Sequence, residues 1–405
     1  MRLLIADKLH PRAIEELRTL PIEVEYDPEL TRDTLEKRLP GVGILVVRST
    51  EVTQQAIDAA RTMHLIVRAG AGYQNIDVRA ASRRGIYVSN IPGKNATAVS
   101  ELVFGMLVCL DRRLPDAVAS LRAAKWERAE FGRAEGLHGK ILGIAGMGAI
   151  GREVAMRAKA FGFNVVGWSR SLTPQKAAEL GIGHASTLEE LASKSQILTV
   201  HLTLTDRTRQ IINKRIFDHM PNGAFFVNAA RADLVDYAAL RDAVQKRGLR
   251  AAVDVYPDEP KGKSEFQTDL FKAVPGGGLL YGTPHIAAST DQAQLAIASE
   301  TVRVIRSFLL EGDVPHVVNV SHTSSARFQM VIRMLDRVGT FANVLGVIKR
   351  HGINVEQVTN TVFEGGSAAC AKLRVVQRPG EACLAEIRAF DEVLNIDVVP
   401  LPNLA

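Results

Sequence analysis

The sequence predicts an α/β protein with two lobes, each built on a parallel sheet of Rossmann-like or flavodoxin-like type, and a C-terminal ferredoxin-like α+β domain. Three observations predict this fold class. Short apolar runs alternate with amphipathic stretches up to about Val318. A Gly-x-Gly-x-x-Gly sequence at residues 146–151 joins an apolar run to a helical pattern. Beyond Val318 the elements follow the order β-α-β-β-α-β.

The alternation falls into two series. In the first, amphipathic stretches such as Pro11–Leu20 and Thr53–Ala60 separate strand candidates at residues 3–6, 43–47, 64–67 and 86–88. The second series runs from Lys140 to about Pro284. Its strand candidates are residues 141–145, 164–167, 197–201, 224–228, 251–254 and 278–282. Strands that alternate with helices in this way are typical of parallel sheets.

Two long helical patterns, at residues 98–110 and 290–310, flank the second series. They could carry the chain out of the first lobe and back into it. We therefore expect a discontinuous substrate-binding domain, residues 1–97 and 288–318, and a nucleotide-binding domain of residues 98–287. After a polar linker, residues 319–327, a regulatory or oligomerising domain is expected over residues 328–405. Its expected strands are 328–334, 354–361, 367–376 and 396–399, and its expected helices are 339–351 and 380–391.

The composition is that of an ordinary soluble globular protein, with 46% hydrophobic and 23% charged residues among 405. The net charge of +6 suits a small anionic substrate, and the scattered basic residues exclude a nucleic-acid stripe. Met1–Asp7 looks like a strand start rather than a signal peptide, and no apolar run could span a membrane, so a cytoplasmic protein is expected. Cys109, Cys370 and Cys383 lack metal-ligand spacing, so no metal is expected.

The glycine sequence carries the most information. Gly146, Gly148 and Gly151 have the spacing of a tight strand-to-helix turn, with Ala149 and Ile150 between the last two. Such a turn lets a pyrophosphate approach the backbone and face a helix N-terminus. The sequence therefore predicts a dinucleotide-binding site here.

Three polar residues follow strands of the second series and have complementary chemistry. Arg231 offers a guanidinium fork for a carboxylate, His285 is an acid that titrates near neutrality, and Glu259 could hold His285 by a hydrogen bond. Taken singly, each fits a surface charge, a helix cap or a turn. Their joint occurrence behind a dinucleotide loop favours hydride transfer to a keto acid. His201 also ends a strand and is interpreted as a structural or cofactor-edge residue.

These residues, together with residues 68–77 and 95–101, resemble the D-isomer-specific 2-hydroxyacid dehydrogenases over residues 1 to about 318. Within that family the chain is most similar to the members that oxidise 3-phospho-D-glycerate to 3-phosphohydroxypyruvate for L-serine biosynthesis. The resemblance implies that Arg231 binds the substrate carboxylate, His285 is the general acid/base and Glu259 is its partner. It implies cofactor contacts from the glycine loop, Arg231 and His285, and from Ser169, Arg170, Ser171, Leu202, Ala229, Ala230, Asp254 and Ala288, with Asp254 at the nicotinamide carboxamide.

The resemblance also implies the substrate contacts. The backbone of Gly70, Ala71 and Gly72 would bind carboxylate as an anion nest. Arg48 and Ser49 match a loop that grips the substrate phosphate, although Arg48 equally fits a surface arginine. Arg128 resembles an arginine that approaches the substrate, of the same or a neighbouring subunit. A homodimer through the nucleotide-binding lobe, or a homotetramer, is implied.

Two departures from the family pattern bear on ligands. Where NAD enzymes place an acidic residue for the ribose 2′-hydroxyl, this chain has Ser169-Arg170-Ser171, so NAD and NADP both remain open as cofactors. The C-terminal domain resembles an ACT domain, a unit that binds amino-acid effectors. Its loop has Met334 and Asp336 where serine-responsive relatives have histidine and asparagine, although Asn354 is kept. We expect weak or absent serine inhibition, and a domain that only pairs subunits fits equally.

Two other functions stay open from the sequence. An NADPH-preferring hydroxypyruvate or glyoxylate reductase fits residues 169–171. A dinucleotide-sensing corepressor resembles the same fold and keeps the same polar residues, but an ACT-like domain fits metabolic control better.

Overall fold

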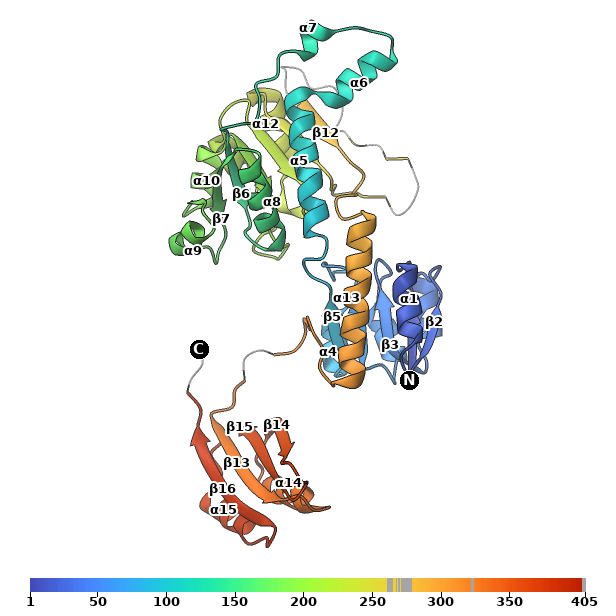
Figure 1. The fold of residues 1–405 in the computed structure, drawn as a ribbon, viewed down its shortest axis with the longest axis vertical. Coiled ribbons are helices and arrows are strands. Elements are labelled where there is room, and N and C mark those ends of the chain that lie inside the picture. The colour runs from blue at the N-terminus through green and yellow to red at the C-terminus, as the bar shows by residue number, and fades with distance from the viewer. Residues whose placement is uncertain (261–264, 267, 269, 271–278, 322–323, 403–405) are drawn as a thin grey trace. The chain divides into compact units, whose positions relative to one another are not determined.

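The computed structural model describes residues 1–260, 265–266, 268, 270, 279–321 and 324–402. It divides into two compact units, Met1–Asn319 and Val320–Ala405. The first unit holds two sheets in which every strand pair is parallel, and the second holds one antiparallel sheet (Figure 1). These sheets confirm the predicted fold class. None of the described helices combines the length and the apolar character that a membrane crossing needs.

The first sheet has the strand order β2-β1-β3-β4-β5. Its core strand β3 is buried over all six residues, as expected for a parallel strand covered on both faces. Edge strand β2 was not predicted, because its sequence Glu-Val-Glu-Tyr has no apolar run. None of its residues is buried. The strands are β1 (Arg2–Ile5), β2 (Glu23–Tyr26), β3 (Val42–Val47), β4 (Leu65–Arg68) and β5 (Tyr87–Asn90), and the helices are α1 (Pro11–Arg18), α2 (Arg32–Leu35), η1 (Glu36–Arg38), α3 (Gln54–Ala59) and α4 (Val78–Arg83).

The second sheet has the order β12-β11-β10-β9-β6-β7-β8. The chain runs from β6 to β7 on one side and later places β9 on the other side, so the order reverses at β6, where ligands of open α/β sheets bind. The strands are β6 (Ile141–Ala145), β7 (Asn164–Trp168), β8 (Gly183–His184), β9 (Ile197–Val200), β10 (Phe225–Asn228), β11 (Arg250–Val253) and β12 (Leu279–Gly282). The predicted start of the last strand, Gly278, lies outside the described residues.

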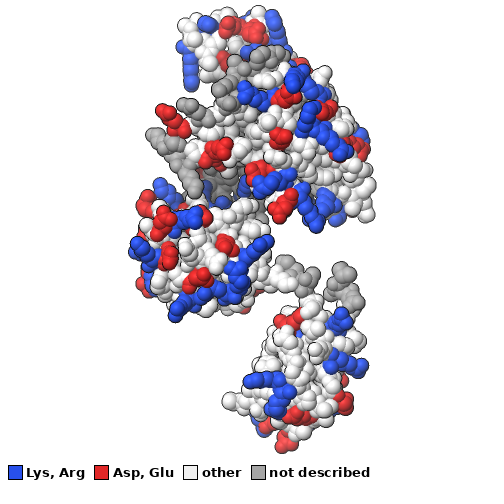
Figure 2. Space-filling view, turned by 180° about the vertical axis from the view of Figure 1, so that it is seen from behind, with Lys and Arg blue, Asp and Glu red and all other residues white. Residues whose placement is uncertain are grey.

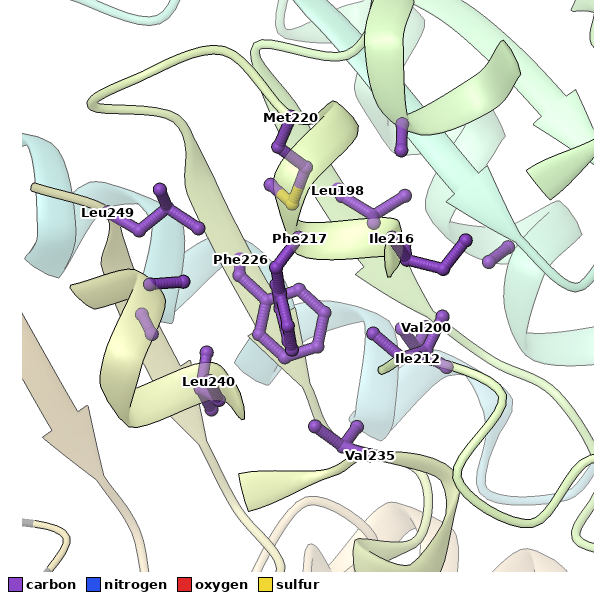
Figure 3. Close-up of a cluster of buried hydrophobic side chains, with 14 of the residues drawn as sticks. Leu198, Val200, Ile212, Ile216, Phe217, Met220, Phe226, Val235, Leu240 and Leu249 are labelled. Atoms are coloured by element: carbon purple, nitrogen blue, oxygen red, sulfur yellow. The ribbon is translucent and has the colours of Figure 1, made fainter. Parts of the chain in front are cut away.

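Helices cover both faces of this sheet. They are α5 (Ala96–Arg112), α8 (Ala149–Ala160), α9 (Pro174–Glu179), α10 (Leu188–Lys194), α11 (Lys214–His219), η2 (Ala232–Leu234) and α12 (Tyr237–Arg247). On one face, Phe217 of α11 meets Phe226 of β10 edge-on, with ring centroids 5.2 Å apart (Figure 3). Leu198, Leu240 and Leu249 complete the surrounding cluster. This packing fixes β10, which leads directly into Arg231.

Helix α13 (Asp291–Leu310) contacts α1 and β4, so the chain returns to the first sheet after completing the second. Between α5 and β6 lie two helices that were not predicted, α6 (Leu114–Arg122) and α7 (Arg128–Phe131). Arg113 has a left-handed backbone conformation, with φ of 51°, which ends α5 and separates it from α6. Neither of the two helices contains a buried residue, and this leaves their apolar side chains exposed.

The C-terminal unit has the order β14-β15-β13-β16 and the predicted β-α-β-β-α-β sequence of elements. Its core joins one sheet face to both helices through Met330, Ile332, Val344, Val347 and Ile387. The last strand begins at Val393, earlier than predicted. The elements are β13 (Phe328–Leu335), α14 (Thr340–Arg350), β14 (Val355–Val362), β15 (Ala368–Val375), α15 (Glu381–Arg388) and β16 (Val393–Pro400). Residues 322–323 of the predicted linker and 403–405 of the predicted domain lie outside the described residues.

Candidate active site

The glycine loop between β6 and α8 has the backbone that a pyrophosphate site needs. Gly146 has φ of 106°, and a Cβ there would lie 2.5 Å from the carbonyl oxygen of His201. A Cβ on Gly151 would lie 1.9 Å from the Gly146 carbonyl oxygen, so this glycine lets α8 pack against the loop. Gly148 is exposed, has open space within 4 Å of the position of a Cβ, and as the N-cap of α8 has no side chain with which to cap this helix. The loop therefore fits a dinucleotide pyrophosphate at exposed backbone amides.

Other predicted cofactor contacts surround this loop. Ser169, Arg170 and Ser171 follow β7, whose last residue, Trp168, accepts the backbone hydrogen bond of Gly146. Arg170 and Ser171 are exposed. Leu202 and Ala288 are half-buried, and Ala229 and Ala230 are buried at the end of β10. The described residues at the end of β7 therefore offer a cation and two hydroxyl groups instead of a carboxylate.

Arg231 is held by the turn that follows β10. The buried amide of Asn228 accepts from the backbone N–H of Ala230 (3.1 Å) and donates to the carbonyl oxygen of Arg231 (3.1 Å). Burial lowers the pKa of Arg231, whereas the charge of Glu259 raises it. A Cβ on Gly72 would lie 2.6 Å from Nη2 of Arg231, which puts this guanidinium directly against the Gly70–Gly72 backbone. The structure thus brings together two groups predicted to bind the substrate carboxylate.

His285 and Glu259 form the second predicted pair. Nδ1 of His285 lies 2.6 Å from Oε2 of Glu259, and the carboxylate can only accept, so Nδ1 carries the proton. The other oxygen of Glu259 accepts from the backbone N–H of Tyr256 (2.9 Å), which fixes the carboxylate. His285 is a non-glycine residue with φ of 53°, in the sterically disfavoured left-handed region. Its imidazole is about half exposed, as a group that exchanges protons with a ligand must be.

Asp254, which was expected at the nicotinamide carboxamide, also binds the segment around His285. Its side chain is fully buried, and both carboxylate oxygens accept hydrogen bonds from the chain itself. Oδ1 accepts from Thr283 Oγ1 (2.5 Å) and the backbone N–H of Ile286 (2.8 Å), and Oδ2 accepts from the backbone N–H of Ala287 (2.8 Å). The residues that donate to Asp254 therefore lie on both sides of His285 in the sequence.

Arginine side chains gather near the Gly70–Gly72 loop, and the sequence interpretation missed one of them. A Cβ on Gly70 would lie 1.7 Å from Nη1 of Arg68, whose guanidinium therefore covers this loop. Burial first, then repulsion from Arg231 and Arg48, lowers the pKa of Arg68 to about 10. The guanidinium of Arg68 is thus close enough to those of Arg231 and Arg48 to be repelled by both, and together the three carry more positive charge than one carboxylate would balance.

Asp7 explains how Arg48 is positioned, and it changes the role expected of Ser49. Oδ2 of Asp7 accepts from the backbone N–H groups of Arg48 (2.7 Å), Ser49 (3.1 Å) and Thr50 (3.0 Å). Ser49 Oγ donates to Oδ1 of the same carboxylate (2.8 Å). The amides and the hydroxyl of this loop are thus already bound. A substrate phosphate would have to meet the Arg48 side chain rather than Ser49.

Two predicted residues stand apart from this cluster. Arg128 lies on α7 and is exposed beside Trp126, which is 82% exposed. Among the described residues, Arg128 forms no hydrogen bond or ion pair with Arg231, His285 or Glu259. His201 is buried, with Nε2 2.9 Å from Thr199 Oγ1. In the part of the chain that is described, its Nδ1 has no hydrogen-bond partner, and burial lowers its pKa to about 3.

The surface charge and the arrangement of possible metal ligands do not point to a further binding site. On the face seen in Figure 2, acidic and basic side chains are interspersed over both units. Among the described residues, no three or more His, Cys, Asp or Glu side chains form a group that could hold a metal ion.

Comparison with known proteins matches one family of dehydrogenases and several relatives. Residues 104–287 match the family described as D-isomer specific 2-hydroxyacid dehydrogenase, NAD binding domain. A D-3-phosphoglycerate dehydrogenase of Methanocaldococcus jannaschii is 35% identical over 345 residues, covering 84% of this chain and 64% of the relative. One of Archaeoglobus fulgidus is 33% identical over 381 residues, covering 90% of this chain and 71% of the relative. The chain thus spans roughly two thirds of the length of these curated relatives.

A solved structure is similar over most of the chain. The NAD+-bound 3-phosphoglycerate dehydrogenase of Entamoeba histolytica is 26% identical, with a TM-score of 0.65. The similarity covers 79% of this chain and 99% of that one.

Proposed function

The chain belongs to the family of D-isomer specific 2-hydroxyacid dehydrogenases, and from that premise we propose that it interconverts 3-phospho-D-glycerate and 3-phosphohydroxypyruvate with a nicotinamide cofactor. The family's NAD-binding domain and the glycine loop support NAD as the cofactor. When bound, the nicotinamide accepts the hydride that leaves C2 of the hydroxy acid.

The carboxylate end of the substrate is assigned to Arg231 and to the Gly70–Gly72 backbone. A guanidinium fork binds a carboxylate in two parallel hydrogen bonds, which fixes the acid in one orientation. Because Arg231 lies against Gly72, a bound carboxylate reaches side-chain and backbone donors together. This orientation sets C2 and its hydroxyl group in place for the proton step.

The proton step is assigned to His285. Since Nδ1 donates to Glu259, Nε2 is the ring nitrogen available to the substrate oxygen. During oxidation Nε2 takes the hydroxyl proton, and the carboxylate of Glu259 stabilises the imidazolium that forms. In the reverse direction the imidazolium returns this proton to the carbonyl oxygen.

One observation favours a phosphorylated substrate: the guanidinium of Arg68 lies near those of both Arg231 and Arg48. One cation suffices for the carboxylate, so the other two are available for a phosphate dianion. The test is to supply 3-phosphohydroxypyruvate and NADH and to identify the product by chiral chromatography. Formation of 3-phospho-D-glycerate is expected. No turnover, or the L-isomer as product, would reject the proposal.

The remaining assignments concern partners. Exposed Leu114, Val118, Leu121 and Trp126 support a second copy docking on the α6–α7 segment, which would form a dimer and bring Arg128 to a neighbouring site. The C-terminal unit is assigned as an ACT-like domain because of its β-α-β-β-α-β order. Met334 is buried and its side chain offers no donor to an effector carboxylate, so micromolar serine should leave the rate unchanged. Inhibition by micromolar serine would contradict this.

The second candidate is an NADPH-preferring hydroxypyruvate or glyoxylate reductase. Ser169, Arg170 and Ser171 favour it because a cation and two hydroxyls suit a 2′-phosphate. Wild-type preference for unphosphorylated hydroxypyruvate with NADPH would support this candidate.

A further inference from the structure

Glu259 lies in a segment that packing alone does not fix. Residues 257–260, which follow β11, are all exposed. The carboxylate of Glu259 accepts from the imidazole of His285 with one oxygen, and its other oxygen accepts from the backbone N–H of Tyr256 (2.9 Å). The orientation of this carboxylate therefore depends on the peptide group that joins Val255 to Tyr256.

That peptide group is itself bound at its other end. Its N–H belongs to Tyr256 and its carbonyl oxygen to Val255, and the two point in opposite directions within one rigid plane. The carbonyl oxygen accepts a hydrogen bond from the hydroxyl group of Tyr237. This bond opposes rotation of the plane, and such a rotation would turn the N–H away from Glu259. Tyr237 and Glu259 thus bind opposite sides of the same peptide group.

The surroundings of Tyr237 set the direction in which its hydroxyl donates. The side-chain amide of Asn228, which is fully buried, donates to this hydroxyl at 3.4 Å. Because the Val255 carbonyl oxygen can only accept, the phenolic proton points toward it. Burial raises the pKa of the Tyr237 phenol, so this proton is retained near neutral pH. Tyr237 is also the first residue of α12, which Asp236 caps by accepting from the N–H of Ala239 (3.0 Å).

We propose that Tyr237 is a positioning residue for the proton step, because its hydroxyl fixes the peptide group that holds Glu259. Through that carboxylate it orients the imidazole of His285. A run of hydrogen bonds extends from Asn228 to the imidazole, and each bond in such a run polarises the next. The inference rests on the proposed function, in which His285 exchanges a proton with the substrate. It needs no contact between Tyr237 and the substrate.

Tyr237→Phe tests this assignment because it removes the hydroxyl and keeps the ring. With whichever 2-keto acid the wild type reduces, kcat should fall by about three- to tenfold, the effect of one lost hydrogen bond. The KM of that acid and the Kd of NADH should stay within about threefold of wild type, because Arg231 and the glycine loop keep their own contacts. An unchanged kcat, or a change confined to KM or to the NADH Kd, would overturn the inference.

The matched control is Tyr281→Phe. Tyr281 lies on β12 of the same sheet and packs against the core cluster on the opposite face from Tyr237. Loss of its hydroxyl should leave kcat within about twofold of wild type, since it does not bind the 255–256 peptide group.

A double-mutant cycle separates positioning of Glu259 from a general effect on the fold. In Glu259→Ala the peptide group has no carboxylate to hold, so adding Tyr237→Phe should change kcat by less than about twofold. If Tyr237→Phe causes the same fold loss with and without Glu259, the two residues act independently and the inference fails.

A further readout needs no activity, so it separates failure of this inference from failure of the proposed function. In protein labelled with ¹⁵N-histidine, the Nδ1 proton that His285 donates to Glu259 should give a far-downfield NMR signal, identified by its loss in His285→Ala. The signal should shift or broaden in Tyr237→Phe and stay unchanged in Tyr281→Phe. An unchanged signal in Tyr237→Phe would overturn the inference, whichever acid the wild type reduces.

3-Fluorotyrosine in place of Tyr237 keeps the inference testable if Tyr237→Phe does not fold. The fluorinated phenol retains the hydroxyl and is more acidic, so it donates more strongly to the Val255 carbonyl oxygen. The Nδ1 signal of His285 should therefore move, and the same replacement of Tyr281 should leave it in place. A signal that stays in place for both replacements would contradict the proposal.

Discussion

Nδ1 of His285 and Oε2 of Glu259 lie 2.6 Å apart, although 26 positions separate the two residues in the chain. The pair lies at the carboxyl edge of the second sheet, beyond β11 and β12. A carboxylate behind an imidazole orients the ring and stabilises its charged form, which is the arrangement that general acid–base catalysis uses.

Replacement of His285 should therefore cost turnover more than binding. We expect His285→Ala to lower kcat by about 10²- to 10⁴-fold, since the reaction loses its proton carrier. Glu259→Gln should cost less, because the ring remains. Steady-state kinetics with His219→Ala as the control checks this, since His219 is an exposed histidine bound to the carbonyl oxygen of Arg215. A loss of less than tenfold in His285→Ala would contradict the assignment.

Arg231→Lys should weaken substrate binding despite preserving the charge. A lysine ammonium cannot form the paired hydrogen bonds of a guanidinium, so kcat/KM should fall by roughly 10- to 100-fold. Exposed Arg152 serves as the control, because Arg152→Lys alters a surface arginine on α8. Equal kinetics for Arg231→Lys and wild type would remove Arg231 from the carboxylate site.

Arg68→Gln should act on the phosphate selectively. We expect kcat/KM for 3-phosphohydroxypyruvate to fall by about tenfold or more, the effect of one charge-assisted hydrogen bond, with hydroxypyruvate much less affected. The measurement is the ratio of the two kcat/KM values in variant and wild type. If both substrates lose activity equally, Arg68 serves the fold or the carboxylate instead.

Arg170→Asp should shift cofactor preference toward NADH. An acidic residue at this place can bind the ribose 2′-hydroxyl, and it repels a 2′-phosphate. The change in the NADH to NADPH ratio of kcat/KM should correspond to roughly 1–3 kcal/mol for one charge-assisted contact. A wild type at least a hundredfold more efficient with NADH than with NADPH would refute the NADP hypothesis.

His201 should make the fold sensitive to acid. Burial lowers its pKa to about 3, whereas in the unfolded chain it titrates near 6.5. Between these values the unfolded state binds a proton that the folded state does not, so stability falls as the pH falls. The contribution is up to about 1.4 kcal/mol per pH unit. Urea unfolding at pH 6.5 and 5 should show a smaller loss in His201→Gln than in wild type; equal losses would contradict this.

The elements that the sequence predicted well are those with strong local signals. The strands β3 and β9 are buried throughout and mostly apolar, and the glycine loop is contiguous in the chain. Helix α6 has no buried residue, so no core-facing stripe distinguishes it from a loop. The edge strand β2 lacked a signal for the same reason.

The site was predictable as a set of residue types, but several side-chain partners were not. Asp7 binds the amides of residues 48–50 because β1 and β3 are neighbours, and the pairing Ile5–Val46 is a property of the sheet rather than of local sequence. Similarly, the sequence places Asp254 at a strand end but does not determine whether its carboxylate faces a ligand or the 283–287 turn. The direction of a side chain depends on packing between distant segments.

The measurement that tests the central claim most directly is the wild-type kcat/KM for 3-phosphohydroxypyruvate compared with hydroxypyruvate, followed by nicotinamide absorbance. Because Arg48 and Arg68 are assigned to the phosphate, the phosphorylated acid should be favoured by about tenfold or more. Equal efficiency, or preference for hydroxypyruvate, would contradict this account of the three guanidiniums.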